Sequence, residues 1–171
     1  IRDSTDPVGQ EILQNTNHVV NEALNAIKEI SNNMSPHVLT NLGVASAISA
    51  FAAKVNMMRG ILIDFRTNME GERFDTDKEV VIYRAACEFI NNGMKHSGAS
   101  RIEIELRRDQ KIITLQYLDN GRGFDMEKLS SEETVGMGIP NIETRVRSVD
   151  GVFVIESARG KGTSALIKVD Q

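Results

Sequence analysis

The spacing of apolar residues changes near Gly60, and this change divides the chain into a helical part and a mixed part. Before Gly60, apolar residues recur every seven positions from Leu13 to Met34, as they do along one face of a helix. After it, ILIDF alternates apolar and polar residues in the manner of a half-buried strand. The chain is therefore expected to fold as a helical segment followed by an α+β domain.

The helical part contains two predicted helices. The seam over residues 13–34 needs a partner helix, and Pro36 interrupts it within SPHVLTNLG. After Gly43 a second stretch places apolar residues at helical spacing, at Ala47, Ile48, Phe51, Ala52 and Val55. We therefore expect a kink or break near the proline and assign residues 1–57 to one helical region.

Strand and helix patterns alternate in the mixed part, residues 58–171. Strands are predicted at 61–65, 102–106, 112–118, 152–157 and 164–169, and helices at 80–95 and 140–149. Thr76 or Asp77 can cap the first of these helices. Because the strands can pair largely as hairpins with helices between them, we predict a two-layer α/β sandwich: a mixed sheet with helices on one face.

The bulk composition is that of a soluble globular protein. The net charge is −4, so the chain offers no basic surface for a phosphate backbone, and no direct nucleic-acid partner is expected. The single cysteine, Cys87, lies among apolar residues and is interpreted as a small buried hydrophobe in a reducing, cytoplasmic setting. GVASAISAFAAKV is shorter than the about 20 apolar residues that cross a bilayer, so no membrane contact by this fragment is expected.

The strand IITLQYL runs into DNGRGF, residues 119–124, which places a carboxylate and two glycines where the strand ends. Asp119 there can accept a hydrogen bond from the exocyclic amine of adenine, where guanine has a carbonyl. Gly121 and Gly123 lack a Cβ, so the backbone can turn sharply and lie against a flat base or ribose. An Asn-Gly hairpin turn explains the same residues without a ligand.

Four polar residues, Glu88, Asn92, Lys95 and His96, lie along the helix that precedes these strands. Their spacing puts Glu88, Asn92 and Lys95 on one helical face. An asparagine oxygen suits Mg²⁺, which binds one or two protein oxygens together with substrate phosphates. Glu88 would orient a metal-bound water, and Lys95 and His96 would neutralise phosphate charge. A solvated helix face is the alternative interpretation.

Two further glycine pairs follow. Gly136 and Gly138 precede a helix that starts near Pro140, where backbone N–H groups attract phosphate and the glycines let the preceding stretch hinge as a lid. Asn141 lies on one side of this helix, where a surface position is the simpler interpretation. In the second pair, GKGTS, the Thr163 hydroxyl can reach the base or a water beside Asp119, although an ordinary hairpin turn is also compatible. All four elements in this order favour an ATP pocket.

The set closely resembles the Bergerat-type ATP-binding domain shared by sensor histidine kinases, DNA gyrase, mismatch-repair ATPases and the large heat-shock chaperones. Sensor histidine kinases fit best. CEFINNGMKHSGAS is similar to their asparagine box, and DNGRGF, GMGIPNI and GKGTS to their three glycine boxes, over about residues 58–169. Two residues depart from the usual pattern of the family. Gly93 stands where alanine is usual, which costs about 1 kcal/mol of stability inside a helix, and Ile139 stands where leucine is usual.

The resemblance implies ATP and Mg²⁺ as cofactors. It assigns adenine recognition to Asp119, Mg²⁺ to Asn92, and the phosphate lid to Gly136 and Gly138. The nucleotide-binding set implied in this way is Asn92, Asp119, Gly121, Gly123, Gly136, Gly138, Ile139, Asn141 and Thr163, and the catalytic set is Glu88, Asn92, Lys95 and His96.

The resemblance also implies partners. The family transfers the γ-phosphoryl of ATP to a histidine on a dimerisation helix, for relay to a response regulator. KHS after the asparagine box and the helix GIPNIETRVRSVDG are similar to the subfamily whose regulators carry helix-turn-helix DNA-binding domains. A homodimer through the helical segment and an inner-membrane anchor in the full-length protein are compatible with this resemblance.

The phosphoacceptor histidine is expected to lie outside this chain. The family places an acidic residue directly after it, and none of His18, His37 and His96 has such a neighbour. Residues 7–34 would then be the second helix of the dimerisation hairpin, and the fragment by itself should not autophosphorylate. The alternatives are a nucleotide-switched ATPase, a serine kinase acting on a regulator, and an inactive dimerising scaffold.

Overall fold

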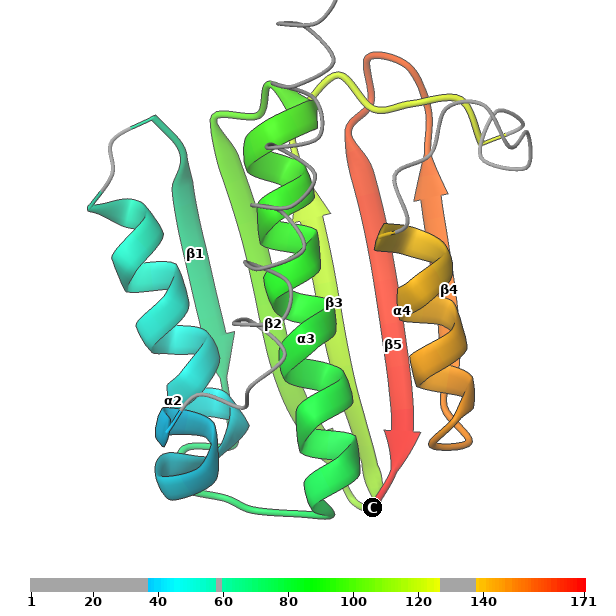
Figure 1. Cartoon of the computed structure of the whole chain (residues 1–171). Coiled ribbons are helices and arrows are strands. Elements are labelled where there is room, and N and C mark those ends of the chain that lie inside the picture. Colours follow the sequence, from blue (N-terminus) through cyan, green and yellow to red (C-terminus); the bar gives the residue numbers. More distant parts are fainter. Residues whose placement is uncertain (1–36, 58–59, 127–137) are drawn as a thin grey trace, which may run out of the picture. The chain divides into compact units, whose positions relative to one another are not determined.

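The computed structural model describes residues 37–57, 60–126 and 138–171, which belong to one compact unit (Figure 1). Its elements are helix α2 (His37–Asn56), strand β1 (Leu62–Thr67), helix α3 (Thr76–Asn92), π-helix η1 (Gly93–Ser97), strands β2 (Arg101–Asp109) and β3 (Ile112–Asp119), helix α4 (Gly138–Arg147), and strands β4 (Val152–Ser157) and β5 (Thr163–Asp170). The strands and the helices after residue 75 lie where the apolar patterns predict them.

The five strands form one mixed sheet in the order β1-β2-β3-β5-β4. β1 pairs parallel to β2, and every other pairing is antiparallel. The register places Asp119, the last residue of β3, opposite Ile102 on one side and Thr163 on the other. The predicted mixed sheet is confirmed, and the antiparallel pairing of β3 with β5 brings the first and third glycine-rich turns to the same end of the sheet.

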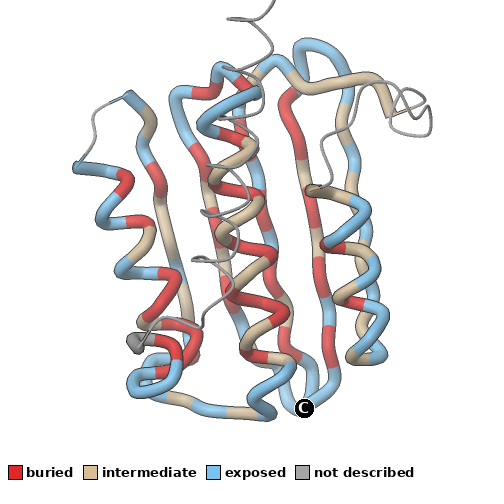
Figure 2. The backbone as a smooth tube through the Cα atoms, viewed as in Figure 1, coloured by how far each residue is buried: buried red, intermediate tan, exposed pale blue. Residues whose placement is uncertain are grey.

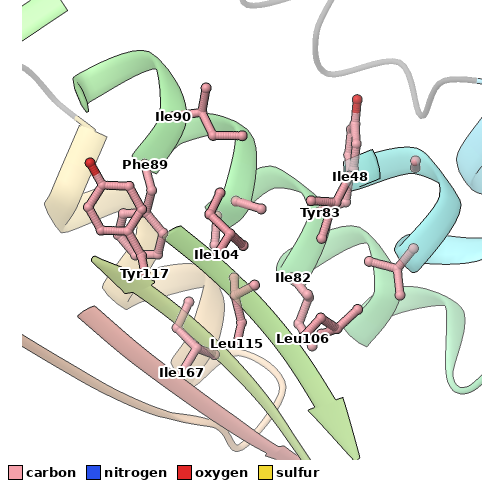
Figure 3. Packing of buried hydrophobic residues seen from close by; sticks show 14 of the residues in the cluster. Ile48, Ile82, Tyr83, Phe89, Ile90, Ile104, Leu106, Leu115, Tyr117 and Ile167 are labelled. Carbon is pink, nitrogen blue, oxygen red and sulfur yellow. The ribbon is translucent and has the colours of Figure 1, made fainter. Parts of the chain in front are cut away.

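Helices α2, α3 and α4 cover one face of this sheet (Figure 1). The core lies between the two layers, and residues of β2, β3 and β5 are alternately buried and more exposed along each strand (Figure 2). Figure 3 shows part of it, in which Ile82 and Phe89 of α3 pack with Ile104, Leu115 and Ile167 of the sheet. The fold class predicted from the sequence, a two-layer α/β sandwich with helices on one face, is confirmed.

Helix α2 belongs to this compact unit. Leu39, Val44, Ile48 and Val55 of α2 are buried in the same core as the sheet, and the helix contacts α3 and β1. The predicted domain boundary after residue 57 therefore lies inside the unit, which begins at His37. An amphipathic pattern shows that a helix needs an apolar partner, but not whether that partner is another helix or a sheet. The heptad seam at 13–34 lies outside the described residues and stays a prediction.

Helix α2 has a break at Gly43, whereas the break expected near Pro36 lies outside the described residues. Gly43 has φ +81° and ψ 174°, and a Cβ there would lie 2.8 Å from Cδ of Arg73. Arg73 donates from Nε and Nη2 to Glu79 at 2.9 and 2.8 Å, and from Nη1 to the Thr40 carbonyl oxygen at 3.0 Å. Because Glu79 is only 1% exposed, this ion pair ties the start of α2 to the start of α3.

The cap of α3 differs from the prediction by one or two residues. Asp75, rather than Thr76 or Asp77, accepts hydrogen bonds from the Asp77 and Lys78 N–H groups at 3.1 and 3.2 Å. Its backbone is extended while that of the next residue is helical, which is the geometry of an N-cap. Among the described helices, none combines the length and apolar character needed to span a bilayer.

Candidate nucleotide site

Asp119 is a buried carboxylate at the end of β3. Alternate residues of β3 face the helices, so Asp119 follows Leu115 and Tyr117 in the buried row and is 4% exposed. Its Oδ1 accepts from the Gly121 N–H at 2.8 Å, and its Oδ2 accepts from the Tyr117 hydroxyl at 2.9 Å. No cation pairs with it among the residues that the structure describes. Since each carboxylate oxygen has about two lone-pair sites, Asp119 can accept a further hydrogen bond.

The turn after Asp119 approaches neighbouring backbone too closely for side chains. A Cβ on Gly121 would lie 2.6 Å from both Cβ and the carbonyl oxygen of Ser97. Gly123 has φ +59°, and a Cβ there would fall on the carbonyl oxygen of Ala158. Both predicted glycines are therefore required by packing against the protein itself, and the left-handed conformation of Gly123 adds to that requirement.

The turn between β4 and β5 is bonded to the turn after Asp119. The Ser157 hydroxyl donates to the Gly162 carbonyl oxygen at 2.9 Å and accepts from the Phe124 N–H at 2.9 Å. The single hydrogen of the Ser157 hydroxyl is used in its bond to Gly162. In the 3.1 Å contact between the Ser157 and Thr163 hydroxyls, Thr163 is therefore the donor. Thr163 is buried beside Asp119, so the structure brings together the base-side residues Asp119, Gly121, Gly123 and Thr163.

The asparagine-box helix is joined to the same turn through Ser97. α3 ends at Asn92 and continues as the π-helical turn η1, which ends at Gly98 with φ +63°. Ser97 accepts from the Arg122 N–H at 2.8 Å through its carbonyl oxygen, and its hydroxyl donates to the Gly93 carbonyl oxygen at 2.5 Å. Single π-turns inside helices are frequent at functional sites.

A second cluster forms where α3 faces the start of α4. A Cβ on Gly138 would touch the Glu88 carboxylate and lie 3.3 Å from Nδ2 of Asn92. Glu88 and Asn92 are half-buried, four residues apart on α3. The start of α4 at Gly138 therefore lies against Glu88 and Asn92 of α3.

The remaining predicted residues are not joined to either cluster by a hydrogen bond in the described part of the chain. Lys95 and His96 are exposed on η1, where the winding changes from α-helical to π-helical after Asn92. The common face of Glu88, Asn92 and Lys95 stays a prediction. Ile139 is half-buried and Asn141 exposed at the start of α4. Gly136 lies outside the described residues.

Several residues that shape the site were missed by the sequence analysis. Ser97 and Ser157 link the turns, and Tyr117 bonds the Asp119 carboxylate. Nothing in the local sequence shows that a core tyrosine two residues before an aspartate bonds to its carboxylate. Gly162, which belongs to the GKG pair named from the sequence, has φ +73° and packs on the Asp119 backbone.

The residues present fit a nucleotide better than a metal ion held by protein side chains alone. The described part of the chain contains no group of three or more His, Cys, Asp or Glu side chains arranged to hold a metal. It does contain a buried acceptor beside two bare backbone turns, and a separate amide and carboxylate at a helix start. Such an arrangement can select a base by hydrogen bonding at one end and hold phosphates at the other.

Comparisons with known proteins agree with this geometry. A family model described as histidine kinase-, DNA gyrase B- and HSP90-like ATPase matches residues 77–171, a range that contains every predicted site residue. Among curated proteins, the sensor histidine kinase ComP of Bacillus subtilis (strain 168) is 33% identical over 161 residues. The matched region covers 94% of this chain, and the chain spans 21% of the length of that relative.

Solved structures share the fold. The histidine kinase domain of the blue-light-activated histidine kinase from Erythrobacter litoralis EL346 superposes with a TM-score of 0.59 at 16% identity, covering 74% of this chain and 60% of that one. The catalytic domain of the histidine kinase ThkA superposes with a TM-score of 0.57 at 16% identity, covering 74% and 88%. At these identities the likeness concerns the fold.

Proposed function

The chain belongs to the family of histidine kinase-, DNA gyrase B- and HSP90-like ATPases, and we propose that it acts as the ATP-binding catalytic part of a sensor histidine kinase. The observation that carries the proposal is the buried Asp119 carboxylate, whose Oδ1 accepts from the glycine turn and whose oxygens keep acceptor capacity. The relative with 33% identity is itself a sensor histidine kinase.

The base end of the pocket would be formed by Asp119, Gly121, Gly123 and Thr163. Asp119 would accept from the exocyclic amine of adenine, a contact that guanine, with a carbonyl there, cannot make. The Thr163 hydroxyl, already a donor to Ser157, lies directly across the β3–β5 pair from Asp119 and would contact the base or a water beside it. The turns at Gly121 and Gly123, which pack without side chains against Ser97 and Ala158, would hold the backbone beside the base.

The phosphate end would be formed by Glu88, Asn92 and the start of α4. The Asn92 oxygen suits Mg²⁺, which would supply charge neutralisation for the β- and γ-phosphates. Glu88 would orient water at that site, and Gly136 and Gly138 would serve the lid. Lys95 and His96, exposed on η1, would approach the phosphates only from the solvent side. Ile139 and Asn141 would contact nucleotide from the first turn of α4.

Phosphoryl transfer needs little covalent work from a protein and depends on positioning and charge. The acceptor would be a histidine on a dimerisation helix outside this chain, and the phosphoryl would pass to a response regulator of the helix-turn-helix type. In the intact protein, a homodimer would bring that helix to the pocket. These partners, the cytoplasmic setting and an inner-membrane anchor in the full-length protein belong to the proposal.

Replacing Asn92 by alanine should remove the Mg²⁺-dependent part of ATP binding. Mutating a residue that only hydrogen-bonds a metal ligand already lowers metal affinity about 10- to 100-fold. Loss of a direct ligand should therefore weaken ATP binding in the presence of Mg²⁺ by about tenfold or more. Calorimetric titration of ATP into wild type and Asn92→Ala, each with Mg²⁺ and with EDTA, measures this. In EDTA the two proteins should bind alike.

Asn91→Ala is the matched control, since it removes the same side chain one position away on α3, about 100° around the helix. It should bind Mg²⁺-ATP as wild type does. Equal losses in the two variants would show a helix defect instead of a lost metal ligand. A wild type that binds ATP equally well with and without Mg²⁺ would contradict the role of Asn92.

Autophosphorylation should require sequence upstream of this chain. Incubated with γ-labelled ATP, the 171-residue chain should incorporate no acid-labile phosphate, because none of its histidines is followed by an acidic residue. A longer version that restores the acceptor helix should become labelled, and the label should be lost in acid. Turnover of ATP without labelled histidine would instead support a nucleotide-switched ATPase.

A further inference from the structure

We propose that Tyr117 is a positioning residue for nucleotide recognition: its hydroxyl holds the Asp119 carboxylate in the orientation that accepts the adenine amine, and the glycine at position 93 leaves room for that hydroxyl. The inference rests on the proposed function of the Asp119 pocket. It concerns a residue that touches no nucleotide and acts through Asp119.

The two oxygens of Asp119 are held by two different donors. Oδ2 accepts from the Tyr117 hydroxyl at 2.9 Å and Oδ1 from the Gly121 N–H at 2.8 Å. One donor belongs to the core and the other to the turn, so together they fix the rotation of the carboxylate about its Cβ–Cγ bond. Without Tyr117, one oxygen of a 4% exposed carboxylate would lose its only hydrogen bond within the described residues.

The position of the Tyr117 hydroxyl is itself fixed by the core. The ring is 2% exposed and stacks on Phe89 of α3, with centroids 5.2 Å apart and planes inclined by 29° (Figure 3). Burial, and after it the charge of Asp119, raise the pKa of Tyr117, so the phenol keeps its proton at neutral pH and acts as the donor. The hydroxyl therefore cannot turn to another partner without unpacking the ring.

Gly93 explains how α3 accommodates this hydroxyl. A Cβ on residue 93 would lie 2.7 Å from the Tyr117 oxygen and 2.5 Å from Cδ1 of Ile102. Glycine inside a helix costs about 1 kcal/mol relative to alanine, the residue that the similar kinases usually have there. Here the cost has a structural reason, because a methyl group would push the hydroxyl away from Asp119.

The test compares two nucleotides that differ only in the exocyclic amine: ATP and purine riboside triphosphate, which lacks it. In Tyr117→Phe the affinity for ATP should fall about fivefold to tenfold, less than on loss of the whole bond to a buried charge, because Asp119 keeps its acceptor oxygens but is no longer held in the orientation that accepts the adenine amine. The affinity for the analogue should stay within about twofold of wild type, because it makes no bond to Asp119. Calorimetry gives both dissociation constants.

Tyr83→Phe is the matched control, because Tyr83 is the other of the chain's two tyrosines and is likewise buried. It lies on α3, away from Asp119, and its hydroxyl is bonded to Cys87. It should change neither affinity. Near-ultraviolet circular dichroism checks that the variants fold. If Tyr117→Phe does not fold, Gly93→Ala serves instead: it keeps the hydroxyl but displaces it, and should produce the same loss for ATP only.

Equal losses for ATP and the analogue would show that Tyr117 supports the fold alone, and would overturn the inference. So would ATP binding by Tyr117→Phe that equals wild type, while wild type itself binds ATP. A wild type that binds neither nucleotide would overturn the proposed function, and this inference with it.

Discussion

Asp119→Asn should weaken ATP binding by about 1.5–3 kcal/mol, which is roughly tenfold to a hundredfold in Kd, because a hydrogen bond to a buried charge is lost. The amide keeps the shape of the carboxylate but replaces one acceptor oxygen by a donor. That donor would face either the Tyr117 hydroxyl or the Gly121 N–H, both of which already donate to this side chain. Calorimetric titration with ATP and with GTP measures the effect.

The preference for adenine over guanine should shrink in the same variant, since an amide nitrogen can donate to the guanine carbonyl. Asp109→Asn is the matched control: Asp109 is exposed at the opposite end of the β2–β3 hairpin. It should leave both nucleotides unaffected. Undiminished ATP binding by Asp119→Asn, or equal loss in both variants, would refute the assignment of Asp119 to the base.

Gly123→Ala should destabilise the fold and abolish nucleotide binding together. Alanine in the left-handed conformation at φ +59° costs about 1–2 kcal/mol. Its methyl group would in addition fall on the Ala158 carbonyl oxygen, and displacing that backbone should cost a further 1–3 kcal/mol, roughly the cost of overpacking. The turns at 122–124 and 157–162 would separate, and with them Thr163 from Asp119. Urea unfolding and ATP titration measure the two losses.

Gly160→Ala separates the two causes of this loss. Gly160 also has a left-handed backbone, with φ +76°, but nothing lies within 4 Å of a Cβ there. Gly160→Ala should therefore lower the free energy of unfolding by only about 1–2 kcal/mol, which is the cost of the left-handed conformation for alanine, and should keep its affinity for ATP. If the two alanine variants lose stability and affinity equally, the close approach at Ala158 has no influence and the conformation alone accounts for Gly123.

The strands, and the helices after residue 75, could be predicted from the sequence because their signals are local. In β3, for example, Ile113, Leu115 and Tyr117 alternate with polar or exposed residues, and that alternation alone places them on one buried face. The place of α2 could not be predicted in this way. Its apolar residues show that one side is covered, but the cover is supplied by β1 and α3, which follow it in the sequence.

The candidate site shows the same division. Asp119, Gly121, Gly123 and Asn92 could be named from motifs, because each motif is a short run on one element. The contact of Gly138 with Glu88 and Asn92 depends on how α4 packs on α3, which spacing along the chain does not contain. The change from α3 to a π-turn after Asn92 likewise could not be read from the polar spacing of this segment.

The order of helices and strands, the family, and the positions of the carboxylate, amide and glycines that suit a nucleotide can all be predicted from the sequence. These follow from chemistry and periodicity within segments of a few residues. That Tyr117 bonds Asp119, that Gly93 leaves room for it, and that Ser97 and Ser157 join the turns becomes visible only in the folded chain. Such contacts are set by sheet register and by the packing of helices on the sheet, which join residues distant in the chain.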